Sequence, residues 1–174
     1  MRIIVEGPDG GGKSRLVGYL SVHFKELDIV RNGMGPDQDL QRWWPAVLAE
    51  SQAWPIVPIH DRFFYSELIY GPILRGHIKV EPPLCQIIQK GLRQEALLIY
   101  ARPDRATLEL GVREESQMEG VTDKFTELVE AYDRLMSVEA GYYGRRFYMF
   151  DWLSTNEPRQ VVEHVQRYLT GGLE

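Results

Sequence analysis

A run of glycines near the start of the chain ends in a lysine and a serine, a composition suited to binding phosphate. The run occupies positions 7–14 and reads GPDGGGKS. Glycines let the backbone bend until successive N–H groups point at one anion, in a space that side chains would fill. The lysine ammonium can bridge neighbouring phosphates, and the serine hydroxyl is a ligand for Mg²⁺. The residues predicted to bind a phosphoryl donor here are Gly7, Asp9, Gly10, Gly11, Gly12, Lys13 and Ser14.

The spacing of this run is that of a P-loop, G-x-x-x-x-G-K-[ST], and the segments on either side agree with that interpretation. Residues 2–6 read RIIVE, which predicts a buried strand. Apolar residues recur at helical spacing over residues 13–25, which predicts a helix whose positive end would meet the anion. A dinucleotide-binding loop would need G-x-G-x-x-G instead. The sequence therefore predicts binding of the phosphates of a nucleoside triphosphate.

A second set of polar residues follows the apolar segment 56–60, which is a predicted strand. Asp61 and Arg62 come first, and Ser66 and Tyr70 follow on a predicted helix. The carboxyl ends of parallel strands are where open α/β sheets bind ligands. Asp61 can order a magnesium-bound water or accept a proton, and Arg62 can grip an acceptor phosphate. The predicted catalytic residues of the two segments are Lys13, Asp61 and Arg62, and the predicted metal ligands are Ser14 and Asp61.

Apolar runs of strand length alternate with runs of helical period, which is the pattern of a parallel sheet. Strands are predicted at 2–6, 27–31, 56–60, 95–101 and 146–151, and helices at 13–25, 39–52, 64–74, 84–92, 104–110, 122–139 and from Asn156 to Gly171. The polar segment 111–121, bounded by Gly111 and Gly120, is predicted to be mobile. We therefore predict an α/β fold: a three-layer P-loop NTPase domain over residues 1–174, with a roughly five-stranded, mostly parallel sheet flanked by helices.

The composition sets limits on the function. The chain has 174 residues, 44% of them apolar, which is enough for a core without a disulfide or metal. Its net charge of -5 argues against a nucleic-acid partner, which favours a basic face. Cys85 is the only cysteine, so neither a disulfide framework nor a cysteine-based zinc site is expected. The first apolar run is too short for a signal peptide or a membrane span, so a cytoplasmic protein with no membrane partner is expected.

The motifs resemble those of the thymidylate kinases. Glu6-Gly7-Pro8-Asp9-Gly10 before Gly-Lys-Ser is similar to that family's Glu-Gly-x-Asp/Glu-Gly pattern. Asp61-Arg62-Phe63, with Ser66 and Tyr70, is similar to its Asp-Arg-(Tyr/His)-x-x-Ser-x-x-Ala-Tyr pattern. The wider relatives are deoxynucleoside kinases, whose corresponding motif opens Glu-Arg-Ser, and Asp61-Arg62-Phe63 fits the monophosphate kinases better. The order of elements also matches over nearly the whole chain.

The resemblance implies a role for each matching position. Asp9 would lie near the 3′-hydroxyl of the acceptor sugar, and Arg62 would hold the acceptor phosphate. The lid at 111–121 would close over the donor phosphates of ATP and its Mg²⁺. The loop at 152–156 would border the adenine. Arg42-Trp43 resembles the family's position that reads the acceptor base, although the segment that contains it is shorter here.

The chain departs from the family at the position of the catalytic arginine. Many relatives carry that arginine within the P-loop, where this chain has Gly10 and Gly11. Other members of the resembled family carry the arginine in the lid, which implies Arg113 as the catalytic arginine here, with Arg105, just before the lid, as the substitute. Candidates for further donor contacts are Arg102, which follows the strand at 95–101, and Arg105. The residues predicted to bind the acceptor are Asp9, Arg42, Trp43, Arg62, Tyr70 and Arg75.

These observations predict ATP-dependent phosphoryl transfer to a deoxynucleoside monophosphate, with a thymidylate-like acceptor favoured. One alternative is a kinase for a hydroxyl group, either of a deoxynucleoside or of a modified base in DNA. In that case Asp61 would act as a base. A second alternative is a P-loop switch or binding module that hydrolyses slowly. The expected partner is a small nucleotide substrate, and a homodimer is also compatible with the sequence.

Overall fold

Five strands form one sheet in which all neighbouring strands run parallel. The computed structural model describes residues 1–31, 42, 45–46, 49, 56–114, 119–154 and 157–173. The strands are β1 (Arg2–Glu6), β2 (Leu27–Arg31), β3 (Val57–Asp61), β4 (Ala96–Ala101) and β5 (Phe147–Phe150). Their order across the sheet is β2-β3-β1-β4-β5. The predicted strands are all present, and each differs from its predicted bounds by two residues at most.

The central strand positions the predicted site. All five residues of β1 are buried, as its unbroken apolar run requires for a strand covered on both faces. Val5 is in register with Asp61 of β3, and Glu6 with Tyr100 of β4. The carboxyl ends of these three strands therefore meet at one edge of the sheet. The P-loop, the Asp61-Arg62 pair and Arg102 all emerge from that edge.

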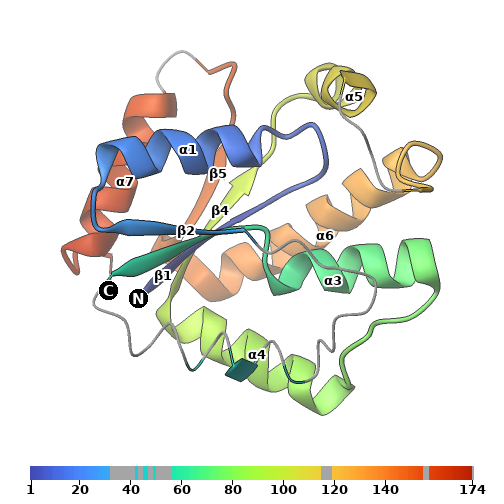
Figure 1. The fold of residues 1–174 in the computed structure, drawn as a ribbon, viewed down its shortest axis with the longest axis horizontal. Helices are drawn as coiled ribbons and strands as arrows, with labels where there is room; N and C mark the ends of the chain where they lie inside the picture. Colours follow the sequence, from blue (N-terminus) through green and yellow to red (C-terminus); the bar gives the residue numbers. More distant parts are fainter. Residues whose placement is uncertain are drawn as a thin grey trace.

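Helices cover both faces of the sheet (Figure 1). On one face lie α1 (Lys13–His23) and α7 (Glu157–Leu169), which share a core with the side chains of Ile3 and Val5. On the other face lie α3 (Phe64–Tyr70), α4 (Pro82–Glu95) and α6 (Phe125–Tyr143), packed on Ile4. Because β1 alternates its side chains between the two cores, it anchors both layers. This arrangement confirms the predicted three-layer α/β architecture.

Three segments differ from their predicted form. Helix α3 continues as a π-helix, Gly71–Arg75, instead of remaining α-helical to 74. Helix α4 begins two residues early, at Pro82, because proline is well suited to the first turn of a helix. Helix α5 spans Arg105–Glu114, so the first residues of the predicted lid are helical, and residues 119–124 form turns. Within the predicted helix at 39–52, only positions 42, 45–46 and 49 belong to the described residues.

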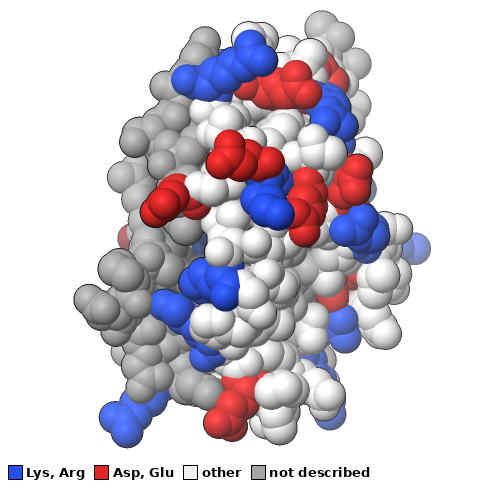
Figure 2. Space-filling view, turned by 90° about the vertical axis from the view of Figure 1, so that its right-hand side faces the viewer, with Lys and Arg blue, Asp and Glu red and all other residues white. Residues whose placement is uncertain are grey.

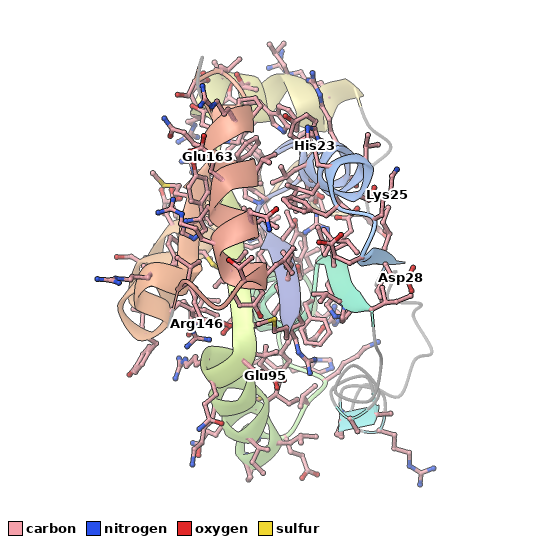
Figure 3. All side chains as sticks on the ribbon, turned by 90° about the vertical axis from the view of Figure 1, so that its left-hand side faces the viewer. His23, Lys25, Asp28, Glu95, Arg146 and Glu163 are labelled. Carbon is pink, nitrogen blue, oxygen red and sulfur yellow. The ribbon has the colours of Figure 1, made fainter. Side chains whose placement is uncertain are left out.

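The two ends of the sheet differ in character. Figure 2 shows the end where α5 and the start of α6 lie, with basic and acidic side chains interspersed over its upper part. Exposed ion pairs on these two elements include Arg105–Glu109 of α5 and Lys124–Glu127 at the start of α6. At the opposite, amino end of the strands, Glu95 and Arg146 lie close to the chain termini (Figure 3). None of the helices in the described part of the chain is long and apolar enough to cross a membrane.

Candidate active site

The P-loop has the backbone conformation that its glycines permit. Gly7 has φ +150°, and a Cβ at that position would collide with the carbonyl oxygen of Ala101, at the end of β4. Gly10 has φ +76°, and a Cβ there would lie 2.5 Å from the carbonyl oxygen of Leu108. Both positions therefore require glycine for backbone conformation and for space. The loop is a bare backbone cradle at the start of α1, which fits an anion such as a phosphate.

Lys13 lies inside this loop. Its side chain is buried, and Nζ donates a hydrogen bond of 2.6 Å to the carbonyl oxygen of Pro8. Burial, together with the nearby charge of Arg62, lowers the pKa of Lys13 to about 7, although Asp9 and Asp61 act in the opposite direction. A buried amine in this state gains by meeting an anion, since a phosphate would compensate the charge that burial disfavours. The predicted donor lysine is therefore held at the centre of the cradle.

Arg62 lies opposite the P-loop in a strained backbone conformation. Its φ is +66°, the only positive value among the described residues other than glycine, and its backbone N–H donates to the carbonyl oxygen of Val5 at 3.0 Å. Such strain persists where the surroundings determine it. The guanidinium pairs with Asp9 and donates to Gly7 O at 3.3 Å and to the Tyr70 hydroxyl at 3.4 Å. The Tyr70 hydroxyl in turn donates to Asp9 at 2.8 Å. The structure thus joins three predicted acceptor-side residues: Asp9, Arg62 and Tyr70.

Glu6, which was not among the predicted site residues, stabilises this arrangement through hydrogen bonds. Its carboxylate is fully buried and accepts hydrogen bonds from the backbone N–H of Phe63 at 2.8 Å and of Ser66 at 3.2 Å. The Ser66 hydroxyl donates to it at 2.7 Å. Burial raises the pKa of Glu6, while the Ser66 hydrogen bond and the charge of Arg62 act in the opposite direction. Glu6 therefore caps the start of α3 and anchors the residues next to Arg62.

Tyr132, on α6, is the second residue that the sequence did not single out. Its hydroxyl accepts from Arg62 at 3.3 Å and lies 2.9 Å from the Ser66 hydroxyl. The sequence predicted only the helix at 122–139 that contains it. A charged residue closing a buried strand, as Glu6 closes β1, is a signal that could have pointed to this network. No comparable signal in the sequence identifies Tyr132.

Asp61 and Ser14 are the predicted metal ligands. Asp61 ends β3 and is half-buried, and Ser14 lies in the first turn of α1 and is exposed. Within the described ranges, no three His, Cys, Asp or Glu side chains gather as a metal-binding group. One carboxylate and one hydroxyl nevertheless fit Mg²⁺, which keeps several waters and relies on phosphate oxygens for other ligands.

The remaining predicted arginines either contact residues outside the P-loop or are exposed. Arg102 makes a two-pronged ion pair with Asp133 of α6, with distances of 2.8 and 2.9 Å. Arg105 contacts Glu109 at 3.0 Å and Thr126 at 2.7 Å. Arg75 pairs with the buried Glu67 at 2.5 Å. Arg113 lies in the last turn of α5 and is exposed. Arg42 is exposed in a helical segment, whereas Trp43 lies outside the described residues.

A tryptophan from the far end of the chain lies against the P-loop. Trp152 follows β5, and its indole N–H donates to the carbonyl oxygen of Gly12 at 3.2 Å. The Arg15 guanidinium lies 4.4 Å from the centre of the indole ring. This contact places Trp152, the first residue of the loop predicted from the resemblance to border the adenine, at the base of the P-loop. Residues 155 and 156 of that predicted loop lie outside the described residues.

Comparison with solved structures identifies the fold. The YorR protein of Bacillus subtilis, in complex with phosphorylated GDP, matches with a TM-score of 0.74 and 21% identity, over 98% of each chain. Deoxyadenosine kinase from M. mycoides matches with a TM-score of 0.57 and 16% identity in its complex with dCMP and dCDP, over 98% of this chain and 99% of that one. Its complex with dATP matches with a TM-score of 0.64 and 13% identity, over 95% and 99%.

Sequence comparison adds no relative to these structures, because neither the models of known protein families nor the curated proteins produce a match. The structural matches extend over nearly the whole chain. The chain therefore has the α/β fold of P-loop kinases, as its motifs predicted.

Proposed function

We propose that this protein transfers a phosphoryl group from ATP to a nucleoside-type acceptor. The observation that carries the proposal is the meeting of two groups at one sheet edge. Lys13 lies inside a bare backbone cradle, and Arg62 is held opposite it through Asp9 and the carbonyl oxygen of Gly7. Two cationic groups at one sheet edge suit a reaction that joins two anionic substrates.

The donor side follows from the P-loop. Its N–H groups and Lys13 would hold the donor phosphates, and Trp152 with Arg15 would lie near the base. Ser14 and Asp61 are the residues that would hold Mg²⁺, which neutralises charge on the donor phosphates when bound. Because the pKa of Lys13 is about 7, a bound donor phosphate would favour its charged form.

The acceptor side follows from Arg62. An acceptor phosphate would replace Asp9 as the partner of the guanidinium, and the fork of Arg62 would align it for attack. An acceptor oxygen then bonds to the γ-phosphorus while the bond to the leaving ADP breaks. An acceptor phosphate is already ionised at neutral pH, so no strong general base is needed. We propose a deoxynucleoside monophosphate, with dTMP favoured by the motif Asp61-Arg62-Phe63.

A hydroxyl acceptor is the second candidate, and two observations favour it. One of the similar structures is a deoxyadenosine kinase. Asp9 also already provides Arg62 with a carboxylate partner, so the arginine does not require a phosphate for charge balance. In this version Asp61 would accept the proton of the hydroxyl as the oxygen attacks the γ-phosphorus.

A coupled assay of ADP release separates the candidates. The purified chain is mixed with ATP, Mg²⁺ and one acceptor from a panel of deoxynucleoside monophosphates, deoxynucleosides and DNA oligonucleotides. We expect turnover that depends on a monophosphate, with dTMP the best of the panel. Turnover only with nucleosides or DNA supports the hydroxyl kinase. ADP release without any acceptor supports a slow hydrolase and contradicts both kinase proposals.

A further inference from the structure

Helix α5 and the P-loop touch backbone to backbone, with a glycine on each side. A Cβ built on Gly111 of α5 would lie 2.5 Å from the Cα of Gly10 and 2.9 Å from its carbonyl oxygen. A Cβ on Gly10 would lie 2.5 Å from Leu108 O and 3.0 Å from Val112 N. No room for a side chain remains on either side of the contact. Figure 1 shows α5 beside the loop that joins β1 to α1.

Gly111 differs from the other glycines within the described α-helices. A glycine inside a helix costs roughly 1 kcal/mol relative to alanine, so one that is retained calls for a reason. A Cβ built on Gly18, Gly91 or Gly141 meets nothing within 4 Å. At Gly111 the same atom would overlap the P-loop backbone. The reason for glycine at this position is therefore the approach of the loop.

The contact holds the loop where its conformation matters. Gly10 is three residues before Lys13, and its positive φ belongs to the bend that forms the cradle. On the α5 side, Leu108 and Val112 are buried, so the helix is fixed against the body of the protein. A fixed helix in contact with Gly10 limits how far the loop backbone can move. Displacing α5 would displace the loop.

We propose that Gly111 is a positioning residue for donor binding, which sets the P-loop in its phosphate-binding conformation through the contact with Gly10. The inference rests on the proposed function, in that the loop holds the donor phosphates. The inference goes beyond the proposed function because it assigns helix α5 a role in the affinity for the donor. The contact at Gly111 lies in the helical part of the segment predicted to be the lid, residues 111–114.

The test compares the same chemical change at two glycines. Gly111→Ala adds a methyl group that must push α5 away from the loop, and Gly141→Ala adds one in open space. Calorimetry with Mg·ATP and with inorganic tripolyphosphate measures donor binding without requiring turnover. We expect Gly111→Ala to weaken both by about tenfold or more, since the loss of even one hydrogen bond from the loop to a charged phosphate costs about that much in affinity. The acceptor KM should stay unchanged.

Gly141→Ala should bind both probes as the wild type does and raise the melting temperature, because alanine favours the helix. Should Gly111→Ala fail to fold, Leu108→Ala serves as the second variant, since its side chain packs beside Gly11 in the same contact. Wild-type donor affinity in a folded Gly111→Ala overturns the inference. A wild-type protein that binds neither probe overturns the proposed function instead.

Discussion

Lys13 and Arg62 illustrate two ways in which a protein holds a cation before its substrate arrives. Lys13 is buried with one carbonyl partner, so its charge is weakly compensated and its pKa is about 7. Arg62 keeps its charge through Asp9 and the surrounding hydroxyl groups. The buried ammonium of Lys13 therefore has little compensating negative charge, which a bound phosphate can provide. At Arg62, an acceptor must compete with a carboxylate already in place.

Lys13→Ala should remove nearly all turnover and leave the fold intact. The side chain projects into the loop and contributes no apolar contact to either core. Its loss should therefore affect stabilisation of the transferred phosphoryl group and not the stability of the fold. The loss of one such stabilising group costs on the order of 10²-fold or more in kcat. The measurement is kcat under saturating ATP and acceptor, with Lys124→Ala, a change on the surface of the turn before α6, as the control. A folded Lys13→Ala with near-normal kcat contradicts the kinase assignment.

Arg62→Lys should weaken acceptor binding and leave ATP binding nearly unchanged. Lysine keeps the charge but loses the fork that grips a phosphate with two hydrogen bonds, which corresponds to roughly 1–3 kcal/mol. The measurement is the KM of acceptor and of ATP for both proteins at one salt concentration. Arg134→Lys, on the exposed surface of α6, is the control. An unchanged acceptor KM favours the hydroxyl acceptor, which presents no phosphate to Arg62.

At the scale of elements, the helical form of α5 changes the geometry of the predicted catalytic arginine. Successive residues of an α-helix are about 100° apart, so Arg113 projects about 200° around the helix from Gly111. Gly111 contacts the P-loop, and Arg113 is exposed on the other side. The predicted action of Arg113 on the donor therefore requires the last turn of α5 to rotate or unwind.

If Arg113 acts on closure, Arg113→Ala should lower kcat on the order of 10²-fold with little change in either KM, because the contact forms only in the closed state. Arg105→Ala should change kcat far less, since Arg105 is already held by Glu109 and Thr126. Steady-state kinetics of the two variants decide the matter. If Arg105→Ala lowers kcat more than Arg113→Ala does, Arg105 supplies the catalytic charge. If both variants have normal kcat, neither arginine of α5 is catalytic.

The elements also show what a single sequence can reveal. The strands, the P-loop and the position of the Asp61-Arg62 motif at the end of a strand were predictable, because each depends on residues close together in the chain. The Glu6–Tyr132 contact joins residues 126 positions apart, and only the fold brings them together. The extension of α5 through Gly111 was missed for a different reason. A glycine near the end of a helical pattern usually indicates the end of the helix. Here the contact with the P-loop explains the glycine at position 111, and the sequence alone does not reveal that contact.

At the scale of the whole molecule, two buried histidines, one on each face of the sheet, link stability to pH. His60, on β3, packs against Phe63 with ring centres 4.4 Å apart, and burial lowers its pKa to about 3. His164, on α7, packs against Tyr148 at 4.8 Å, and burial lowers its pKa as well. In the unfolded chain both titrate near 6.5. At a pH between the lowered pKa of each histidine in the folded protein and its pKa in the unfolded chain, the unfolded state binds more protons than the folded state.

The free energy of unfolding should therefore fall as the pH drops below about 6.5, by up to roughly 1.4 kcal/mol per pH unit for each histidine that stays neutral in the fold. Urea unfolding between pH 4.5 and 7 measures this slope. His60→Phe should reduce the slope, and His164→Phe should reduce it in the part of the range where His164 is still neutral in the fold. His77→Gln, at an exposed position, should leave it unchanged. The slope decides the test even where a variant is less stable at every pH, because a lost packing contact shifts the whole curve without tilting it. A wild-type slope in His60→Phe would show that this histidine is charged inside the folded protein.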